Sequence, residues 1–567
     1  MTRPSSLPTL QGLRLRENQL FFAITVLVGV LAGLSAVLFT LAIEWTGRLF
    51  FGLDPQPARL FLVPTVASLL AGVLLTLVFP EVRGSGVPQT KAAFQLQNGV
   101  IPIRVPMGKF LMGALCVGSG HSMGREGPSV QIGAGLASAI GQWVGLPRER
   151  LRELVPVGAA GALAAAFNTP VSAVIFALEE IIGDLNAPLI GSTVVASVAS
   201  VMVERTILGN EPLFRVPTYH LVHPAELAAY AVLGVAGGII SLAFCHGLLR
   251  ARRAAQRLTP RGRMFLPALG GAIIGLVIIV VPQVMGVGYE YIDQALNGGL
   301  VLNTLLLLCG VKLVATIVSY ATGNAGGIFA PSLYIGAMAG GAVGIVTQWV
   351  APFPTADTGA YALVGMGTLF AGIIRAPLTS VFMIFEITQD YQILVPLMVA
   401  NMLSFAISRR YLPVPIYHAL LEQDGIHLPP AIATPPTDWT AGDAMSDAFL
   451  QVPPELTVDE VRARADGRPD RAVFVGAGQR VTGIVGLPEI DSAIAAGRGA
   501  DAIGAIARPA PDALWVDAPH EEVLKRLLSE SRPVPVVDAG DDGVVVVHGA
   551  IRATDVLRHL SASRDDH

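Results

Sequence analysis

Long stretches of apolar residues, separated by short polar segments, fill most of the chain and predict helices that cross a membrane. The first run, Phe21–Ile43, has 23 residues and no charge, which is enough to span about 30 Å of hydrocarbon. We therefore expect a membrane domain over residues 19–430, after a polar arm at residues 1–18. Further uncharged runs are Phe61–Pro80, Leu185–Val203, Ala228–Leu249, Phe265–Tyr289 and Leu313–Ala356.

The last of these runs cannot be one straight helix. Leu313–Ala356 has 44 residues and contains Gly323, Gly326, Gly327 and Pro331. Irregular backbone at membrane depth is tolerated where it is buried in protein or lines a wet cavity. Because these interruptions cluster and carry polar residues, we favour a transport pathway over a set of ordinary kinked helices.

An internal repeat supports the pathway. Gly124–Pro128 reads GREGP, and Gly327–Pro331 reads GIFAP. Each motif is followed by a proline with a glutamate nine positions further on, as in Pro170–Glu179 and Pro377–Glu386. Broken segments at corresponding places in two halves indicate a transporter binding site near mid-membrane. The residues alone leave open whether the repeats are inverted or parallel.

Composition agrees with a membrane protein. Hydrophobic residues make up 52% and charged residues 14%, whereas soluble domains carry about 25% charged residues. The net charge of −4 gives no reason to expect a nucleic-acid partner. Cys116, Cys245 and Cys309 lie in apolar runs without metal-ligand spacing, so we expect no metal, no cofactor and no disulfide framework. The sequence shows no nucleophile–base pair, so we do not expect an enzyme.

Arginines predict the orientation of the chain, because short loops rich in basic residues stay in the cytoplasm. One group precedes the first span and another follows the run that ends at Leu249. We expect a multi-pass protein of the cell membrane with both termini in the cytoplasm. These arginines are Arg3, Arg14, Arg16, Arg250, Arg252, Arg253, Arg257, Arg261 and Arg263.

The composition changes near residue 430. Residues 431–440 are rich in Pro and Thr and read as a linker. Beyond them, charged segments with short β-rich runs predict a soluble α/β region. Two units, 441–497 and 502–562, repeat a β-α-β-β-α order.

Candidate anion ligands lie in small-residue segments. Gly84–Pro88 reads GSGVP, where Ser85 offers a hydroxyl and a helix start offers backbone N–H groups to an anion; a capped turn is the plainer interpretation. Gly327–Pro331 has no carboxylate, so we expect it to contribute the N–H groups of Ile328 and Phe329. A helix-breaking turn is the alternative there.

Four further residues have a functional and a plain interpretation. Glu126 precedes a helix start in an apolar environment, where an anion needs donors or must be protonated; alternatively it is an exposed neighbour of Arg125. Glu179 and Glu180 are either a proton relay or the wet end of a helix. Tyr417 follows the last apolar run, where it can donate to an anion or belong to an aromatic belt.

Together these motifs resemble the CLC family of chloride channels and proton-coupled chloride exchangers. GSGVP, GREGP and GGIFAP occur in the family's order, and Tyr417 follows the last membrane helix as in the family. The resemblance implies an all-α polytopic membrane domain of two inverted repeats with broken, tilted helices. It also implies a homodimer with one anion path per subunit.

The resemblance implies roles for the candidate residues. Ser85 and Tyr417 correspond to the side chains at the central chloride site, and Ile328 and Phe329 to its backbone ligands. Glu126 corresponds to the external gating glutamate, whose carboxylate occupies an anion site until it is protonated.

Glu180 corresponds to the internal proton-transfer glutamate of exchangers. Having both glutamates favours chloride/proton antiport over the alternative, a passive chloride channel of the voltage-gated type. A third hypothesis is a membrane sensor whose C-terminal region reports nucleotide or ionic strength.

The C-terminal region resembles a cytoplasmic tandem CBS pair, a module that often binds adenine nucleotides through a Ser or Thr three positions before an Asp. Gly486 and Glu489 stand at these positions in the first unit, and Arg552 and Asp555 in the second. Since both hydroxyls are missing, a structural role is at least as well supported as nucleotide sensing.

Overall fold

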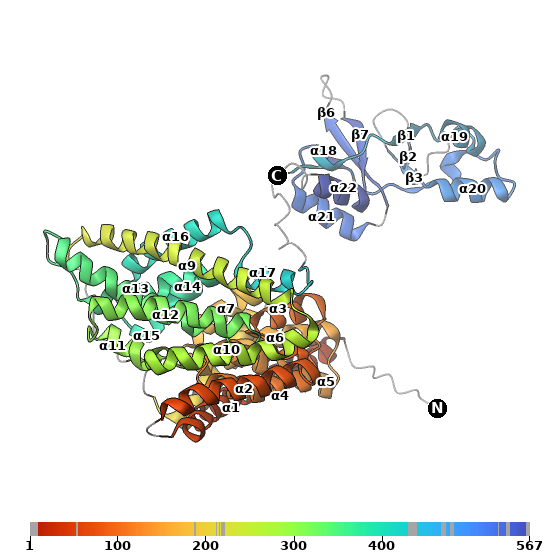
Figure 1. Cartoon of the computed structure of the whole chain (residues 1–567). Helices are drawn as coiled ribbons and strands as arrows, with labels where there is room; N and C mark the ends of the chain where they lie inside the picture. The colour runs from red at the N-terminus through yellow and green to blue at the C-terminus, as the bar shows by residue number, and fades with distance from the viewer. Residues whose placement is uncertain are drawn as a thin grey trace. The chain divides into compact units, whose positions relative to one another are not determined.

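The chain forms two compact units, residues 1–429 and 430–567, and each is described by itself (Figure 1). Their coordinates come from a computed structural model. The predicted linker at 431–440 lies, up to residue 438, outside the described part of the chain. The described residues are 10–52, 55–185, 189–210, 213–214, 216, 222–428, 439–465, 472–476, 481–530, 532–539 and 545–562.

The first unit is helical and consists of two halves whose elements follow the same order, except that η2 follows α7 in the first half and no such element follows α15 in the second. The first half contains α1 (Leu10–Phe51), α2 (Pro57–Leu77), η1 (Pro80–Val82), α3 (Val87–Leu96), α4 (Arg104–Gly118), α5 (Glu126–Val144), α6 (Arg148–Phe167), α7 (Pro170–Phe176), η2 (Ala177–Ile182) and α8 (Ile190–Leu208). The second half contains α9 (Glu226–Gln256), α10 (Pro260–Val280), η3 (Pro282–Val284), α11 (Tyr289–Leu296), α12 (Leu302–Ala321), α13 (Phe329–Val350), α14 (Thr358–Ile374), α15 (Pro377–Thr388) and α16 (Leu394–Tyr411). The short helix α17 (Ile416–Gln423) follows both halves.

Glycine and proline break the apolar runs where the sequence predicts it. The run Leu313–Ala356 is divided between α12 and α13 by the non-helical segment 322–328. Helix α1 starts at Leu10, so helical structure extends into the segment predicted as a polar arm. Seven helices among the described residues are long and apolar enough to cross a membrane.

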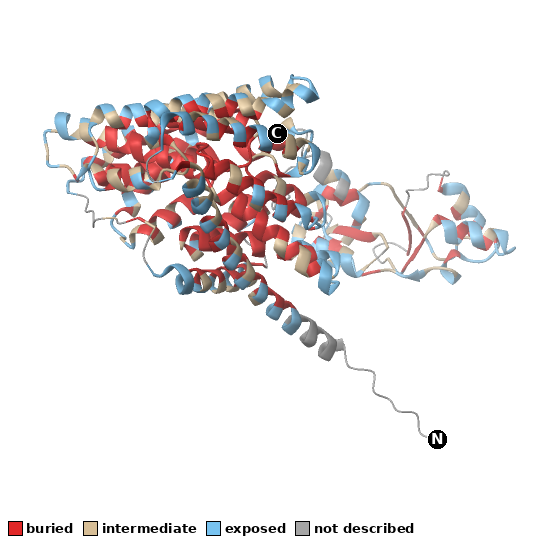
Figure 2. Ribbon diagram, turned by 60° about the horizontal axis from the view of Figure 1, so that its bottom comes forward, coloured by how far each residue is buried: buried red, intermediate tan, exposed pale blue. Residues whose placement is uncertain are grey.

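Apolar side chains face outward as well as inward in this unit. Figure 2 shows buried positions concentrated between the helices and exposed positions on their outer faces. Many of those outward positions are large apolar residues, for example Leu62 on α2, Val232 on α9 and Leu306 on α12, each more than half exposed. This pattern is that of a protein whose surroundings are lipid rather than water.

Two glutamates at matching positions show how the halves meet. Glu179, at the end of the α7–η2 segment, accepts hydrogen bonds from the N–H groups of Leu378 (3.2 Å) and Thr379 (2.9 Å) at the start of α15. Glu386, near the end of α15, accepts hydrogen bonds from the N–H groups of Val171 and Ser172 at the start of α7. Because each segment caps the N-terminus of the other, α7 and α15 lie antiparallel.

The C-terminal unit contains two α/β repeats in the predicted β-α-β-β-α order. The first comprises β1 (Phe449–Val452), α19 (Val458–Arg464), β2 (Ala472–Val475), β3 (Gly483–Val485) and α20 (Leu487–Ala495). The second comprises β5 (Leu514–Trp515), α21 (His520–Ser529), β6 (Val534–Ala539), β7 (Val545–Ile551) and α22 (Ala553–Ala562). In both sheets the first two strands are parallel and the next pair is antiparallel.

The two repeats exchange their leading segments, which changes the predicted unit boundaries. Helix α18 (Ala441–Ala444) packs in the core of the second repeat with Leu514 and Val534. Conversely, Ile503 packs in the core of the first repeat, and β4 (Arg508–Pro509) pairs with β3. Each repeat therefore includes a short segment that lies outside its own β-α-β-β-α run in the sequence.

Candidate functional site

The three glycine-containing motifs meet at one place in the membrane unit. Gly124 and Gly327 exchange two backbone hydrogen bonds of 2.8 Å, as a short antiparallel bridge. The Gly84 N–H donates to Asn324, and the Gly84 carbonyl accepts from Gly326 at 3.1 Å. Thus the turns GSGVP, GREGP and GGIFAP, which are far apart in sequence, form one irregular cluster of backbone.

Small residues are required for this approach. A Cβ atom built on Gly127 would collide with the Ser85 hydroxyl and come within 3.3 Å of the Cα atom of Gly327. Gly86 has φ +104°, and a Cβ there would lie 2.8 Å from the Gly127 carbonyl oxygen. The glycines therefore allow three chain segments to touch where any side chain would separate them.

Helices α3, α5 and α13 all start beside this cluster, at Val87, Glu126 and Phe329. The first four N–H groups of an α-helix have no partner within the helix, and their partial positive charge favours an anion. The N–H groups of Ile328 and Phe329 belong to the start of α13, as the sequence predicts. The Phe329 ring also packs against the rings of Phe167 (5.0 Å) and Phe370 (4.4 Å).

Two buried hydroxyl groups lie beside the cluster. The side chains of Ser85 and Tyr417 are fully buried, and their oxygens have no hydrogen-bond partner among the described residues. Tyr417, on the first turn of α17, lies beside the Ser85 side chain and within electrostatic reach of Glu180 and Glu126. Since buried polar groups in proteins are almost always hydrogen-bonded, two such hydroxyls close together are available as donors to an anion.

Glu126 is the first residue of α5 and is fully buried. Its Oε1 accepts a hydrogen bond from the Tyr289 hydroxyl, a partner that sequence reasoning missed. Its Oε2 has no hydrogen-bond partner among the described residues, although the N–H of Ala330 lies nearby. The exposed-neighbour interpretation of Glu126 is therefore wrong, because the carboxylate points into the protein toward the start of α13.

Glu179 and Glu180, which the sequence left undecided, have different surroundings. Glu179 is the cap on α15 described above. Glu180 is buried in η2, a π-helical turn, and its Oε1 accepts a hydrogen bond of 2.9 Å from the Lys91 ammonium on α3. Both side chains of this ion pair are only 6% exposed. Sequence analysis did not anticipate Lys91, since nothing local connects it with a residue 89 positions away.

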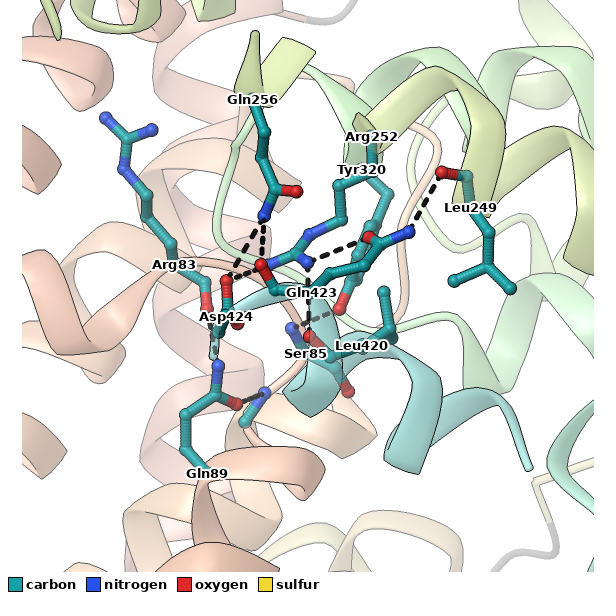
Figure 3. A network of polar contacts seen from close by, with 11 residues as sticks. Arg83, Ser85, Gln89, Leu249, Arg252, Gln256, Tyr320, Leu420, Gln423 and Asp424 are labelled. Atoms are coloured by element: carbon teal, nitrogen blue, oxygen red, sulfur yellow. Dashed lines mark hydrogen bonds and ion pairs between the residues drawn. The ribbon is translucent and has the colours of Figure 1, made fainter. Parts of the chain in front are cut away.

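A polar network anchors the helix that carries Tyr417. Arg252 on α9 donates hydrogen bonds to the Leu420 carbonyl (3.2 Å) and the Gln423 side chain (3.0 Å), and forms an ion pair of 2.6 Å with Asp424 (Figure 3). The same view includes Ser85, whose backbone N–H donates to the Tyr320 hydroxyl at 3.4 Å. The arginine thus fixes the C-terminal end of α17, and with it the place of Tyr417 at the other end.

The C-terminal acids that stand at CBS-like positions are already engaged. Asp555 accepts a hydrogen bond from the Arg552 N–H at 3.1 Å, at the start of α22. Glu489 lies 3.7 Å from Arg508. Each carboxylate therefore has a local structural partner. Within the described residues, no group of three or more His, Cys, Asp or Glu side chains is arranged to hold a metal ion.

Comparisons with known proteins agree with the motifs. A family model described as voltage gated chloride channel matches residues 67–409. The H(+)/Cl(-) exchange transporter ClcA of Vibrio cholerae serotype O1 (strain M66-2) is 30% identical over 418 residues, which cover 70% of this chain and 88% of that protein.

Two solved structures share the architecture. The crystal structure of a slow cyanobacterial Cl-/H+ antiporter is 26% identical with a TM-score of 0.65, over 71% of this chain and 97% of that one. The crystal structure of a eukaryotic CLC transporter is 20% identical with a TM-score of 0.62, over 94% of this chain and 97% of that one, and supports the fold alone. The family model and the ClcA relative show that the chain belongs to the CLC family of voltage gated chloride channels and is a multi-pass membrane protein.

Proposed function

We propose that this protein exchanges chloride for protons across the membrane. The observation that carries the proposal is the pair of buried acids, Glu126 and Glu180, around the unpartnered hydroxyls of Ser85 and Tyr417. Coupled exchange needs a place for chloride and two groups that can carry a proton. The two hydroxyls offer the place for chloride, and the acids on α5 and η2 are the two proton carriers.

Chloride is bound by neutral donors in this proposal. The Ser85 and Tyr417 hydroxyls and the N–H groups of Ile328 and Phe329 surround the ion without placing a full positive charge beside it. Partial charges at helix N-termini stabilise an anion, yet they bind it more weakly than a buried arginine would. Weak binding suits transport, because the ion must also leave.

Glu126 acts as the external gate. Its carboxylate points to the start of α13, where the unpaired N–H groups would otherwise face an anion, so the ionised side chain takes the place of chloride. Protonation removes its charge and with it the attraction to the helix ends. The side chain can then leave, and chloride can enter the vacated position.

Glu180 delivers protons from the internal side. It is buried, and the Lys91 ammonium compensates its charge when it carries no proton. Without such a partner an ionised carboxylate at this depth would be costly. Tyr417 lies within electrostatic reach of both acids, which supports an arrangement of two proton carriers around one anion site.

The names of similar proteins support this interpretation. The Vibrio cholerae relative is an H(+)/Cl(-) exchange transporter, and the cyanobacterial structure is that of a Cl-/H+ antiporter. The first match includes 88% of the relative's length, so the similarity is to a whole transporter rather than a fragment.

The proposal is tested in liposomes containing the purified protein and an imposed chloride gradient. We expect chloride flux to drive protons in the opposite sense when there is no initial pH difference. Glu126→Gln should abolish proton movement and leave chloride flux in place. Glu290→Gln, which neutralises an exposed acid on α11, is the matched control and should behave like the wild type. Chloride flux without any proton movement in the wild type would overturn the proposal.

One observation favours the second candidate, a passive chloride channel gated by Glu126. The Lys91–Glu180 ion pair stabilises the charged form of Glu180, and an acid held in that form would not shuttle protons. In that case the electrical potential at zero current equals the chloride equilibrium potential at every pH. A deviation that follows the proton gradient would reject the channel.

We also propose a homodimer with both termini in the cytoplasm. Apolar side chains exposed on α8 and α16, among them Val198, Met202, Met398 and Met402, offer a surface for a second copy. The mass of the protein in detergent, measured by light scattering, tests the dimer. Protease sites added at each terminus, probed in sealed vesicles of known orientation, test the placement of the ends.

The C-terminal unit is proposed to be a tandem CBS pair with a structural role. Its two β-α-β-β-α repeats support the assignment, and the local engagement of Asp555 and Glu489 argues against nucleotide recognition. Titration of the full-length protein with ATP should give no saturable binding up to millimolar concentrations. Saturable binding would revive the sensor hypothesis.

A further inference from the structure

Two buried lysines at matching places in the halves anchor matching loops. Lys109 on α4 donates to the carbonyls of Val82 (2.7 Å) and Gly84 (2.8 Å). Lys312 on α12 donates to the carbonyls of Val284 (3.0 Å), Gly286 (2.7 Å) and Val287 (3.2 Å). An ammonium has three donors and no acceptor, so each lysine holds a short run of carbonyl groups in place, and the Gly84 carbonyl also accepts from the Gly326 N–H.

Each anchored loop leads directly to a polar side chain at the candidate site. The first loop continues through Gly84 to Ser85 and then to α3. The second passes through Gly286 and Gly288, which have φ +59° and +83°, to Tyr289 at the start of α11. Because corresponding anchors hold both loops, Tyr289 is positioned by the same device that positions Ser85.

The backbone before Tyr289 has little freedom. A Cβ on Gly288 would lie 2.7 Å from the Tyr334 ring, and the positive φ disfavours any other residue. The Tyr334 hydroxyl donates to the Gln283 carbonyl at 3.2 Å, and its ring lies 4.7 Å from the Lys312 ammonium. The loop therefore restricts the backbone of Tyr289 to one position.

Three contacts hold the Tyr289 side chain itself. Its hydroxyl donates to Glu126 Oε1. The Arg125 guanidinium lies 5.4 Å from its ring, and the ring of Phe214 meets it edge-on at 5.3 Å. The phenol is thus held by Arg125 and Phe214 and directed at the carboxylate of the proposed gate.

We propose that Tyr289 is a positioning residue that holds ionised Glu126 in the closed position, an inference that rests on the proposed function. The donor O–H stabilises the carboxylate only while the carboxylate accepts, that is, while it is seated and charged. The strength of this hydrogen bond then sets how often the gate opens at a given pH. The charged and titratable groups that face Glu126 are Arg125 and Tyr289, with Tyr417 further along the path.

The test is Tyr289→Phe, which removes one oxygen atom and keeps the ring contacts with Arg125 and Phe214. Losing a hydrogen bond to a charged group changes an equilibrium by about 10-fold. We therefore expect chloride turnover at neutral pH to rise by about 10-fold, and the pH of half-maximal transport to move about one unit to the alkaline side. Proton transport should persist, because Glu126 is still present to carry the proton.

A double variant separates positioning from general packing. In a Glu126→Ala background the side chain that accepts from Tyr289 is absent, so adding Tyr289→Phe should change neither the rate nor its pH dependence. Tyr291→Phe, the same change two residues further along α11, is the control and should behave like the wild type. Unchanged transport in Tyr289→Phe, or an equal rate change in both backgrounds, would overturn the inference.

The same set of variants separates this inference from the proposed function. If Glu126→Gln still couples protons to chloride, the gate assignment fails, and the inference falls with it. If Glu126→Gln loses coupling but Tyr289→Phe matches the wild type, only the tyrosine assignment fails.

Discussion

The two halves of the membrane unit share a scaffold but not their chemistry. Both contain a lysine that anchors a loop, Lys109 and Lys312, and both end a short helix with a glutamate that caps the other half. These matched groups bind backbone atoms. Features that hold the fold are therefore present twice, as expected for a duplicated unit that must be built in both halves.

The proposed transport groups are present once. Glu126 is the first residue of α5, and Phe329 is the first residue of α13. Ser85 stands two residues before α3, where the second half has Val287 before α11. Glu180 follows the first capping glutamate, and Ile387 follows the second. The comparison teaches that one half supplies most side chains of the path, whereas the other supplies mainly backbone donors.

The largest effect should come from removing an anchor shared by both halves. Lys109→Met removes a donor from two carbonyls, of which Gly84 keeps the N–H of Gly326, and Lys312→Met removes the donor from three, at about 1–3 kcal/mol for each carbonyl left unpaired. We expect either variant to lose most of its folded protein, measured by size-exclusion chromatography in detergent. Lys525→Met, on α21 of the C-terminal unit, serves as the control. If either anchor variant elutes and melts like the wild type, the anchors are not equivalent in importance.

Neutralising the acid that only one half contains should affect proton transport. Glu180→Gln is expected to lower proton flux by about 100-fold, the scale of a lost proton-transfer group, while chloride flux continues. Neighbouring Glu179→Gln should leave proton coupling intact, because Glu179 binds N–H groups of α15. Coupled proton and chloride fluxes in liposomes measure both variants. Loss of coupling in Glu179→Gln would show that the cap also belongs to the proton path.

The matched caps should have matched and moderate effects. Glu179→Ala and Glu386→Ala each remove a charged acceptor of two backbone N–H groups, worth about 1.5–3 kcal/mol. We expect the two variants to lower the melting temperature by similar amounts, and the double variant by roughly their sum. A large effect from one variant alone would mean that the halves are unequal in stability too.

The smallest effect tests the second duplicated region, the C-terminal unit. Hydrogen bonds from the Thr440 N–H and hydroxyl lower the pKa of Asp443 below its usual value. The ionised Asp443 side chain thus stabilises the folded unit at neutral pH, and this stabilisation is lost as the pH falls through the lowered pKa. Asp443→Asn should reduce the melting temperature of this unit by about 2 °C at pH 7. The two proteins should converge in acid, and a difference that persists there would contradict this explanation.

Sequence patterns predicted the features that depend on local chemistry. Glycines and Pro331 marked the break between α12 and α13, and the repeated spacing from Pro170 to Glu179 and from Pro377 to Glu386 marked the two halves. The β-α-β-β-α order of the C-terminal repeats was also confirmed. Each of these signals lies within a few turns of chain.

Contacts between distant segments could not be read from the sequence. The spacing that marked the repeat belongs to a pair of caps, since the N–H groups bound by Glu179 lie about 200 positions away. Tyr289 meets Glu126 across 163 positions. Aligning GVGYE after Val284 with GSGVP after Val82 would have drawn attention to Tyr289, because each sequence follows the loop that a buried lysine anchors.

The end of the α7 segment has a consequence for how a duplicated helix acquires a new function. In η2 the Gly183 N–H bonds to the Leu178 carbonyl, five residues back, whereas in α15 the Gln389 N–H bonds to Phe385, four residues back. A widened turn accommodates one extra residue and rotates the next residues about the helix axis. The wider turn can thus keep the first glutamate facing the other half and direct the second toward Lys91.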